Sequence, residues 1–487
     1  MLTAGQSRHR SGRARPRRQA ANGNGHVVAH LALPLRRWIA ETHPARLVVL
    51  ALVGVILLGT ALLKLPVASA AGESPSLLTA LFTATSGVCV TGLLVVDTGS
   101  YWSGFGDVVV LVLVQVGGFG IMTLASLLAL LVAGKLRLST TLSLDTETSA
   151  GGGDIRRLLG RIALITVTVE AVTAVLVTAR LTLGHGEPLG RALYHGVFHA
   201  VSAFNNAGLS PYPGSLSRFA GDPWTLLPLA ATALIGGLGF PVIIELLRYR
   251  ARRRGPGGVR TSTPWSLHLR LTLATSALLL VAGWVLTLTF EWNNPTTFGP
   301  FTVGQKVLNA FFHSTVARTA GFNTTEIAAM EPETLLGTSV LMFIGGGSAG
   351  TAGGIKVTTV AVLGAAVLAE VRGHREAGLF GRRISPQVVR QALTVTLLSA
   401  VVLVVAIVAL MSLIHVRAEL VVFEAVSAFG TVGMHTGLVG DSQTAAQVII
   451  MVLMFVGRVG PIILVSALAM RVREQRYRLP QERPIIG

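Results

Sequence analysis

The chain has 487 residues, of which 51% are hydrophobic and only 13% are charged, and its mean hydropathy is +0.65. Soluble globular domains carry about a quarter charged residues, so this composition excludes an ordinary soluble protein and indicates an integral membrane protein. The formal net charge of +18 would favour nucleic acid as the partner of a soluble protein, but here its placement reports membrane topology. The single cysteine, Cys89, excludes an internal disulfide framework and a CxxC metal or redox motif.

Residues 1–46 form a basic tail with nine arginines, one acid (Glu41) and little apolar periodicity. This composition predicts a mostly disordered cytoplasmic segment. An arginine-rich mitochondrial-type targeting peptide is the alternative, whereas a cleaved signal peptide does not fit so long a charged region. A second basic cytoplasmic tail is predicted at residues 471–487.

Between the tails one unit recurs four times: a spanning helix, a short apolar run, a glycine turn and a second spanning helix. The units occupy residues 47–133, 155–247, 265–370 and 386–470. A span needs about 20 apolar residues. The short runs are half that length and are predicted to be re-entrant pore helices, at residues 77–86, 193–204, 303–315 and 420–429. The predicted fold is an all-α membrane protein with eight spans and four re-entrant pore helices in pseudo-fourfold symmetry around one pore.

The turn after each short run ends in one glycine followed by a large apolar residue. The four glycines are Gly92, Gly208, Gly321 and Gly433, separated by 116, 113 and 112 residues. Selective cation conduction needs backbone carbonyls that replace an ion's hydration shell, and glycine lets the backbone take the positive φ that turns them to an axis. Each pore helix would also direct its partly negative C-terminal end toward the cavity beneath. The candidate lining residues are Val90, Thr91, Gly92, Asn206, Ala207, Gly208, Thr319, Ala320, Gly321, Thr431, Val432 and Gly433.

The basic residues test the orientation independently. The two tails and the loops at 134–161, 248–270 and 371–390 hold 31 of the 40 lysines and arginines. Since basic residues accumulate on cytoplasmic loops, both termini are predicted to be cytoplasmic, and the glycine turns enter from outside. Anionic membrane lipid and a cytoplasmic partner are secondary interpretations of the same charge.

Five motifs together resemble the Trk/Ktr/HKT superfamily of potassium transporters over about residues 47 to 470. They are CVTGL at 89–93, FNNAGL at 204–209, RTAGFNT at 318–324, IGGGSAGTAGGIK at 344–356 and FVGRVGP at 455–461. The first glycine turn follows a single spanning helix, which is similar to the Ktr-type membrane subunit. The resemblance implies potassium uptake across the cell membrane through a selectivity filter, with lower selectivity than a GYG-type channel. A serine in place of Gly92 would have indicated that sodium could also permeate.

The resemblance also implies a homodimer with one pore in each protomer. A cytoplasmic ring of nucleotide-binding regulatory subunits of the KtrA/TrkA type would control the gate, with the loops at 248–270 and 371–390 as contact surfaces. This chain has no Rossmann fingerprint, so nucleotide is expected only on that separate chain. No cofactor is expected in this chain beyond potassium in the filter, and no nucleic-acid partner.

A glycine-rich run interrupts the second span of the third unit. A Walker loop is excluded because Lys356 follows Gly-Ile and no strand precedes it. A plain helix kink is the alternative, and the resemblance identifies the run as an intramembrane gate. The gate residues would be Gly345, Gly346, Gly347, Ser348, Ala349, Gly350, Thr351, Ala352, Gly353, Gly354, Lys356 and Arg458.

Charged residues within apolar segments usually face a cavity or a partner. Arg458 would raise the barrier to cations when the gate is closed, unless it only binds buried carbonyls. Arg318, directly before the third filter segment, is expected to point behind the filter. Glu424 is a possible counter-charge, and Glu170 is expected in a buried pair.

No arrangement of residues predicts catalysis. His195 and His199 share a helix face but have no third ligand, so packing or contact with water is their expected use. A sodium- or proton-coupled secondary transporter with re-entrant hairpins is the alternative function. Such transporters often contain inverted repeats, whereas these four units share one orientation. A scaffold or receptor would not need four matched glycines.

Overall fold

A computed structural model describes residues 44–140, 152–254, 265–440 and 442–470. The chain divides into two units, Met1–Val48 and Val49–Gly487. Of the first unit only the start of helix α2 (Pro44–Leu63) is described. The tail predicted at 1–46 therefore lies outside the described residues apart from 44–46, and the tail at 471–487 lies wholly outside them.

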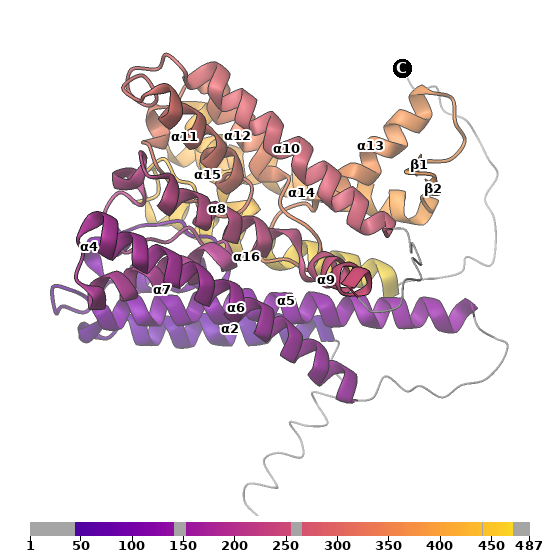
Figure 1. Cartoon of the computed structure of the whole chain (residues 1–487), viewed down its shortest axis with the longest axis horizontal. Helices are drawn as coiled ribbons and strands as arrows, with labels where there is room; N and C mark the ends of the chain where they lie inside the picture. Colours follow the sequence, from indigo (N-terminus) through magenta and orange to yellow (C-terminus); the bar gives the residue numbers. More distant parts are fainter. Residues whose placement is uncertain (1–43, 141–151, 255–264, 441, 471–487) are drawn as a thin grey trace, which may run out of the picture. The chain divides into compact units, whose positions relative to one another are not determined.

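The described part of the second unit is mostly helical, as the composition predicted (Figure 1). After α2 the elements in chain order are η1 (Pro66–Ala68), α3 (Leu77–Val88), α4 (Thr98–Tyr101), α5 (Gly104–Thr140), α6 (Gly152–His185), α7 (Leu189–Asn205), η2 (Ser217–Phe219), α8 (Pro223–Leu238), α9 (Phe240–Arg254), α10 (Leu267–Glu291), α11 (Val303–Val316), η3 (Ile327–Ala329), α12 (Pro332–Phe343), α13 (Val357–Val371), β1 (Gly378–Leu379), β2 (Arg382–Arg383), α14 (Pro386–Leu413), α15 (Ala418–Gly430) and α16 (Thr444–Met470).

Several helices are long and apolar enough to cross a membrane. In the described part of the chain four meet that test by length and composition, within α5, α6, α10 and α14, and a fifth does if the bent pair α8–α9 counts as one span. Shorter apolar helices, Val49–Leu63, Val357–Val371 and Thr444–Gly460, lie at three more of the predicted spans. The chain is therefore a multi-pass membrane protein, and the count of eight spans stays a prediction.

The four predicted short runs are helices α3, α7, α11 and α15, of 12, 17, 14 and 13 residues. At 1.5 Å per residue each is shorter than a hydrocarbon core of about 30 Å. Local sequence starts two of them: Ser76 Oγ accepts from the N–H of Thr79, and Thr302 and Gln305 form a reciprocal capping box. Each short helix packs against long helices next to it in the chain, namely α3 on α5, α7 on α6 and α8, α11 on α10, and α15 on α14 and α16.

The prediction of one continuous spanning helix at residues 224–247 is wrong. It breaks between α8 and α9, which meet at a bend of 100°. Gly239 forms the break with a φ of +91°, and a Cβ there would overlap the carbonyl oxygen of Ser348 in the glycine-rich run. Glycine is required both for this backbone conformation and for the close approach.

The span predicted at 335–368 is interrupted where the sequence indicated. Helix α12 ends at Phe343 and α13 begins at Val357, with the run of residues 345–354 between them. A further departure from an all-α fold is a two-stranded antiparallel hairpin of β1 and β2, in which Gly378 pairs with Arg383 and Leu379 with Arg382.

We expect Gly239→Ala to lower the thermal unfolding midpoint of the detergent-solubilised protein. The substitution adds a left-handed non-glycine residue, which costs about 1–3 kcal/mol, and a clash with Ser348. Gly364→Ala is the matched control, since Gly364 lies in α13 and a Cβ there meets open space. Equal midpoints for the two variants would contradict the assigned role of Gly239.

Candidate functional site

The four predicted glycines meet in a ring. A Cβ placed on any one of them would overlap the carbonyl oxygen of the residue just before the next glycine. The overlaps run from Gly92 to Ala207, from Gly208 to Ala320, from Gly321 to Val432 and from Gly433 to Thr91. The contacts follow chain order and close on themselves, so four segments more than a hundred residues apart surround one point. We call these four glycines the ring.

All four ring glycines have a positive φ, as predicted from the glycine at each turn. The φ values are +88° at Gly92, +67° at Gly208, +63° at Gly321 and +91° at Gly433. The residue two positions before the glycine is also left-handed in three segments, Val90 (+53°), Asn206 (+61°) and Thr431 (+48°). A β-branched residue in that region is a rare outlier that costs about 1–3 kcal/mol and persists only where the surroundings impose it. Strain of this kind clusters at functional sites.

The hydrogen bonds that end the short helices hold this backbone. Three segments share a bond from the N–H of the residue before the glycine to the carbonyl of a serine five residues earlier: Thr91 to Ser86 (2.8 Å), Ala207 to Ser202 (2.7 Å) and Val432 to Ser427 (2.9 Å). This is the six-residue bond of a Schellman end. In two segments the same serine hydroxyl also accepts from the ring glycine, Ser86 from Gly92 at 3.0 Å and Ser427 from Gly433 at 3.2 Å. The hydroxyl of Ser202 has no partner among the described residues.

The third segment ends differently. The N–H groups of Thr319, Ala320 and Gly321 all donate to the carbonyl of Val316, at 3.1, 2.8 and 3.0 Å. Its backbone reaches the ring without the left-handed residue found in the other three segments. The four segments are therefore similar but not equivalent, as the differences between their sequences suggest.

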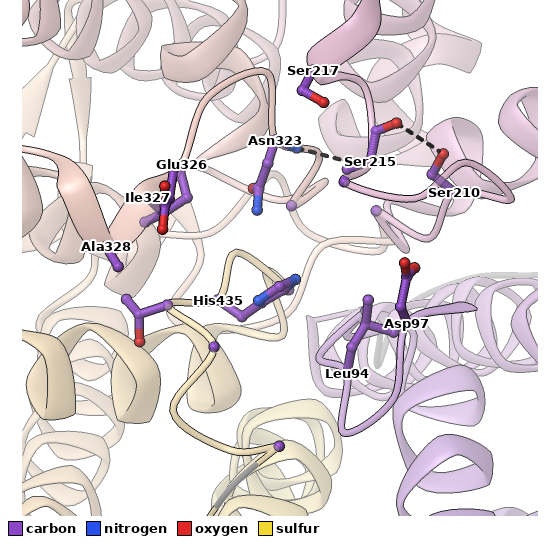
Figure 2. A pocket seen from close by; sticks show the side chains of 18 of the residues that line it. Leu94, Asp97, Ser210, Ser215, Ser217, Asn323, Glu326, Ile327, Ala328 and His435 are labelled. Atoms are coloured by element: carbon purple, nitrogen blue, oxygen red, sulfur yellow. Dashed lines mark hydrogen bonds between the residues drawn. The ribbon is translucent and has the colours of Figure 1, made fainter. Parts of the chain in front are cut away.

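A cavity of about 490 Å³ opens on the ring and is lined by the four glycines and the loops that follow them. Figure 2 shows Asp97, Asn323, Glu326 and His435 around it. None of the described residues that line it is a lysine or an arginine. Burial holds the pKa of His435 below its usual value, although the carboxylate of Asp97 opposes this, so the imidazole is uncharged at neutral pH. The net electrostatic character of the cavity is acidic.

Two of the loops that form the cavity wall are joined by hydrogen bonds. Ser210 Oγ donates to the carbonyl of Ser215 at 3.3 Å, and Ser215 Oγ accepts from the N–H of Asn323 at 3.2 Å (Figure 2). The N–H of Leu216 returns to the carbonyl of Asn323 at 2.9 Å. The second and third segments are thus fixed to each other beyond the ring.

The glycine run, residues 345–354, packs directly against two ring segments. Asn206 is best satisfied with Nδ2 donating to Thr319 Oγ1 (3.0 Å) and the carbonyl of Ala233 (3.1 Å), while its Oδ1 accepts from Thr351 Oγ1. A Cβ on Gly353 would overlap Thr431 Oγ1. None of the residues of the run lines the cavity.

The break between α8 and α9 holds the run in place. Gly347 donates to the carbonyl of Gly237 at 2.8 Å, and Thr351 donates to the carbonyl of Gly236 at 3.2 Å. Phe240, at the start of α9, donates to the carbonyl of Ala349 at 3.3 Å. The bend between α8 and α9, which the sequence did not predict, therefore provides the backbone groups that bind the run.

Both predicted basic residues contact the run. Lys356 Nζ donates to the carbonyl of Ala352, and Arg458 Nη1 donates to the carbonyl of Thr351. Arg458 is 3% exposed, and its Nε and Nη2 have no partner among the described residues. One carbonyl bond therefore leaves most of the buried guanidinium without a partner among the described residues.

Arg318 turns away from the ring. Its Nη1 donates to the carbonyl of Ser276 on α10 at 2.9 Å and its Nη2 to Ser276 Oγ at 3.2 Å, and it is 4% exposed. Glu424 accepts from both the N–H and the hydroxyl of Thr436 at 2.9 Å. Its partner among the described residues is therefore a threonine, and its use as a counter-charge stays a prediction.

Glu170 does lie in a buried polar contact, but its partners are amides. Gln115 Nε2 and Asn205 Nδ2 each lie 3.3 Å from its carboxylate, and Asn205 Nδ2 also donates to Gln115 Oε1 at 2.6 Å. Asn205 directly precedes Asn206 in the second ring segment. The network therefore supports that segment from behind.

Both histidines on this face of α7 make hydrogen bonds within the protein. His195 bonds Glu187 at 3.0 Å and His199 bonds Ser210 at 3.0 Å. Within the described ranges no group of three or more His, Cys, Asp or Glu could hold a metal ion. We did not predict the roles of Ser86, Ser202 and Ser427, which we call the serine anchors. A serine six residues before the glycine recurs in three of the four turns and could have revealed them.

Comparisons with known proteins show which family the chain resembles. A family model described as TrkH, cation transport protein, matches residues 46–476. The chain is 34% identical to the Ktr system potassium uptake protein B of Bacillus subtilis over 454 residues, which cover 93% of this chain and 98% of that protein. It is 35% identical to the protein of the same name from Vibrio alginolyticus over 443 residues, covering 91% and 94%.

Two further matches extend the comparison. The potassium/sodium uptake protein NtpJ of Enterococcus hirae is 33% identical over 455 residues, covering 91% of this chain and 97% of that protein. The crystal structure of the potassium transporter TrkH from Vibrio parahaemolyticus has the same fold, with a TM-score of 0.65 at 21% identity. That match covers 88% of this chain and 85% of the other.

The serine anchors make a test possible within one chain. We expect Ser427→Ala to destabilise the protein by about 1–3 kcal/mol, because the buried N–H of Gly433 loses its acceptor. Ser202→Ala, at the same place in the second segment, removes a hydroxyl without a partner and should have little effect. The thermal midpoints of both variants in detergent measure this, and equal losses would rule out the anchoring role.

Proposed function

The chain belongs to the TrkH family of cation transport proteins, as its motifs predicted, and on that premise we propose that it takes up potassium across the cell membrane by conduction through the ring. The relatives named above are called potassium uptake proteins, which supports potassium as the cargo. The closed ring of four glycines is the observation that carries the proposal. It would form the selectivity filter of a pseudo-fourfold pore built from four repeats.

The chemistry of the ring suits a dehydrated cation. Positive φ turns backbone carbonyls away from helical directions, and carbonyl oxygens replace the hydration shell of potassium in filters. Each ring glycine follows the C-terminal end of a short helix by a few residues, and these helix ends add partial negative charge. The four helices are α3, α7, α11 and α15. The filter residues would be those predicted from the sequence, residues 90–92, 206–208, 319–321 and 431–433.

The cavity would serve as the entrance. Its acids, Asp97 and Glu326, raise the local concentration of cations, and the neutral His435 does not oppose them. Most lysines and arginines lie in the two tails and in the loops at 134–161, 248–270 and 371–390, which supports an external cavity and cytoplasmic termini.

The glycine run would be the gate. It contacts two ring segments through Thr351 and Gly353, and six of its ten residues are glycines that can change conformation at low cost. Arg458 holds the run by the carbonyl of Thr351 and places a positive charge beside it. We infer that this contact keeps the run in the closed conformation and raises the barrier to cations.

Control of the gate would come from other chains. The relatives' name, protein B of a Ktr system, supports the proposal that this chain is the membrane subunit of a larger assembly. A homodimer with a cytoplasmic nucleotide-binding ring is the arrangement we propose. The potassium ion is cargo, and nucleotide would be bound only by the separate regulatory subunits.

Sodium is the ion to test beside potassium, because one relative is named a potassium/sodium uptake protein. Sodium coupled to uptake would make the protein a secondary transporter, which is the alternative function. A flux assay with both ions distinguishes conduction from coupling.

We expect Gly92→Ala to reduce rubidium uptake into proteoliposomes about tenfold or more, since the added Cβ costs a positive-φ strain and overlaps the carbonyl of Ala207. Gly72→Ala is the control, because Gly72 also has a positive φ (+73°) but its Cβ would meet open space. Parallel assays with rubidium and sodium report both rate and selectivity. Unchanged flux and selectivity in Gly92→Ala would refute the ring as the filter.

We expect Thr351→Val to increase basal rubidium flux about two- to tenfold, the factor that corresponds to one lost hydrogen bond. The substitution keeps the side-chain volume and removes the hydroxyl contact between the run and Asn206. Ser348→Ala is the control within the run, since the hydroxyl of Ser348 contacts Thr358 at 3.1 Å instead of a ring segment. Equal fluxes in both variants would contradict the gating role of the contact.

A further inference from the structure

The connection between α13 and α14 carries a feature that conduction does not use. Strands β1 and β2 are joined by Phe380 and Gly381, which both have a positive φ, +53° and +72°. A two-residue turn of this kind is normally built from asparagine, aspartate and glycine. Here a phenylalanine occupies the first position and is 49% exposed. We call residues 376–384 the hairpin.

One face of the hairpin is fixed to the ends of membrane helices. Ile384 is buried in a cluster with Val362 and Ala365 of α13 and Ala392 of α14, and Ala377 and Leu379 pack against the same cluster, as does Leu267 of α10. The N–H of Ile384 donates to the carbonyl of Ala377 at 2.8 Å.

The position of this cluster sets the level of the hairpin. Val362 lies nine residues before the end of α13, a distance of about 14 Å along the helix axis. The hairpin therefore lies back along the helix instead of projecting from its end, and Figure 1 shows β1 and β2 beside α13. This places it alongside α13 and close to the first turns of α10 and α14.

The exposed residues of the hairpin and of the segment just before it include four arginines. Arg372, Arg375, Arg382 and Arg383 are all exposed, and among the described residues only Arg383 has an acidic partner, Glu376 at 2.6 Å. The hairpin therefore presents an exposed aromatic tip close in sequence to Arg382, which has no acidic partner among the described residues, and to Arg383.

We propose that the hairpin binds the anionic phospholipid of the inner membrane leaflet, with Phe380 inserted at the headgroup–acyl boundary and the arginines on lipid phosphates. Aromatic side chains favour this boundary, and basic residues are attracted to anionic headgroups. The location beside apolar helix faces favours lipid over a soluble partner, because Val367 and Val371 of the same helix are also exposed. The proposal depends on the cytoplasmic orientation proposed above but not on the ring being a filter.

The only native cysteine is buried, so an introduced cysteine can be labelled selectively. The test places a polarity-sensitive fluorophore on Phe380→Cys in the full chain, in nanodiscs of phosphatidylcholine with and without phosphatidylglycerol. Glu73→Cys, exposed on the predicted outer side, is the control. We expect phosphatidylglycerol to shift the Phe380→Cys emission to the blue and to reduce iodide quenching, with no change at residue 73.

A second variant tests the charge. Adding Arg382→Gln to the Phe380→Cys protein should weaken the effect of phosphatidylglycerol about fivefold, the factor associated with one basic residue at an anionic surface. Equal iodide quenching in both lipid compositions would overturn the proposal. Protection that appears only after addition of a cytoplasmic partner protein would also overturn it, by assigning the surface to protein docking. None of these readouts requires transport, so failure here leaves the filter proposal untouched.

Discussion

The structure depends on the absence of a side chain at four positions. Each ring glycine lies so close to the carbonyl of the next segment that a single added methyl group would overlap it. Packing in protein interiors leaves little room to absorb such an overlap. The four segments therefore determine one another, and the strained backbone at Val90 and Thr431 is retained because neighbours on both sides fix it.

The same constraint explains the glycine run and the bend in α8–α9. Backbone approaches backbone at Gly239 and Ser348, and the N–H groups of the run donate to carbonyls freed where α8 ends. Non-helical backbone at membrane depth must be satisfied by surrounding protein, and the two broken helices satisfy each other. Thr351 then connects this pair to Asn206, so that a displacement of the run would be felt in the second ring segment.

Periodic features of the sequence predicted much of this arrangement. The repeat spacing predicted the short helices within a few residues and the positive φ of all four glycines. The bend at Gly239 was missed because α8 and α9 read as one continuous apolar stretch, and its cause lies more than a hundred residues away at Ser348. The partners of Glu170 and Glu424 could not be predicted, since both depend on tertiary contacts that leave no local pattern.

Locating the ion tests directly whether the ring binds potassium. Crystals of the protein soaked in rubidium should give anomalous density at the centre of the ring, surrounded by the carbonyls of the four segments. We expect Gly321→Ala, whose Cβ would overlap the carbonyl of Val432, to lose this density. If rubidium density is absent from the ring of the wild-type protein, or stays unchanged in the variant, the ring is not the ion-binding site.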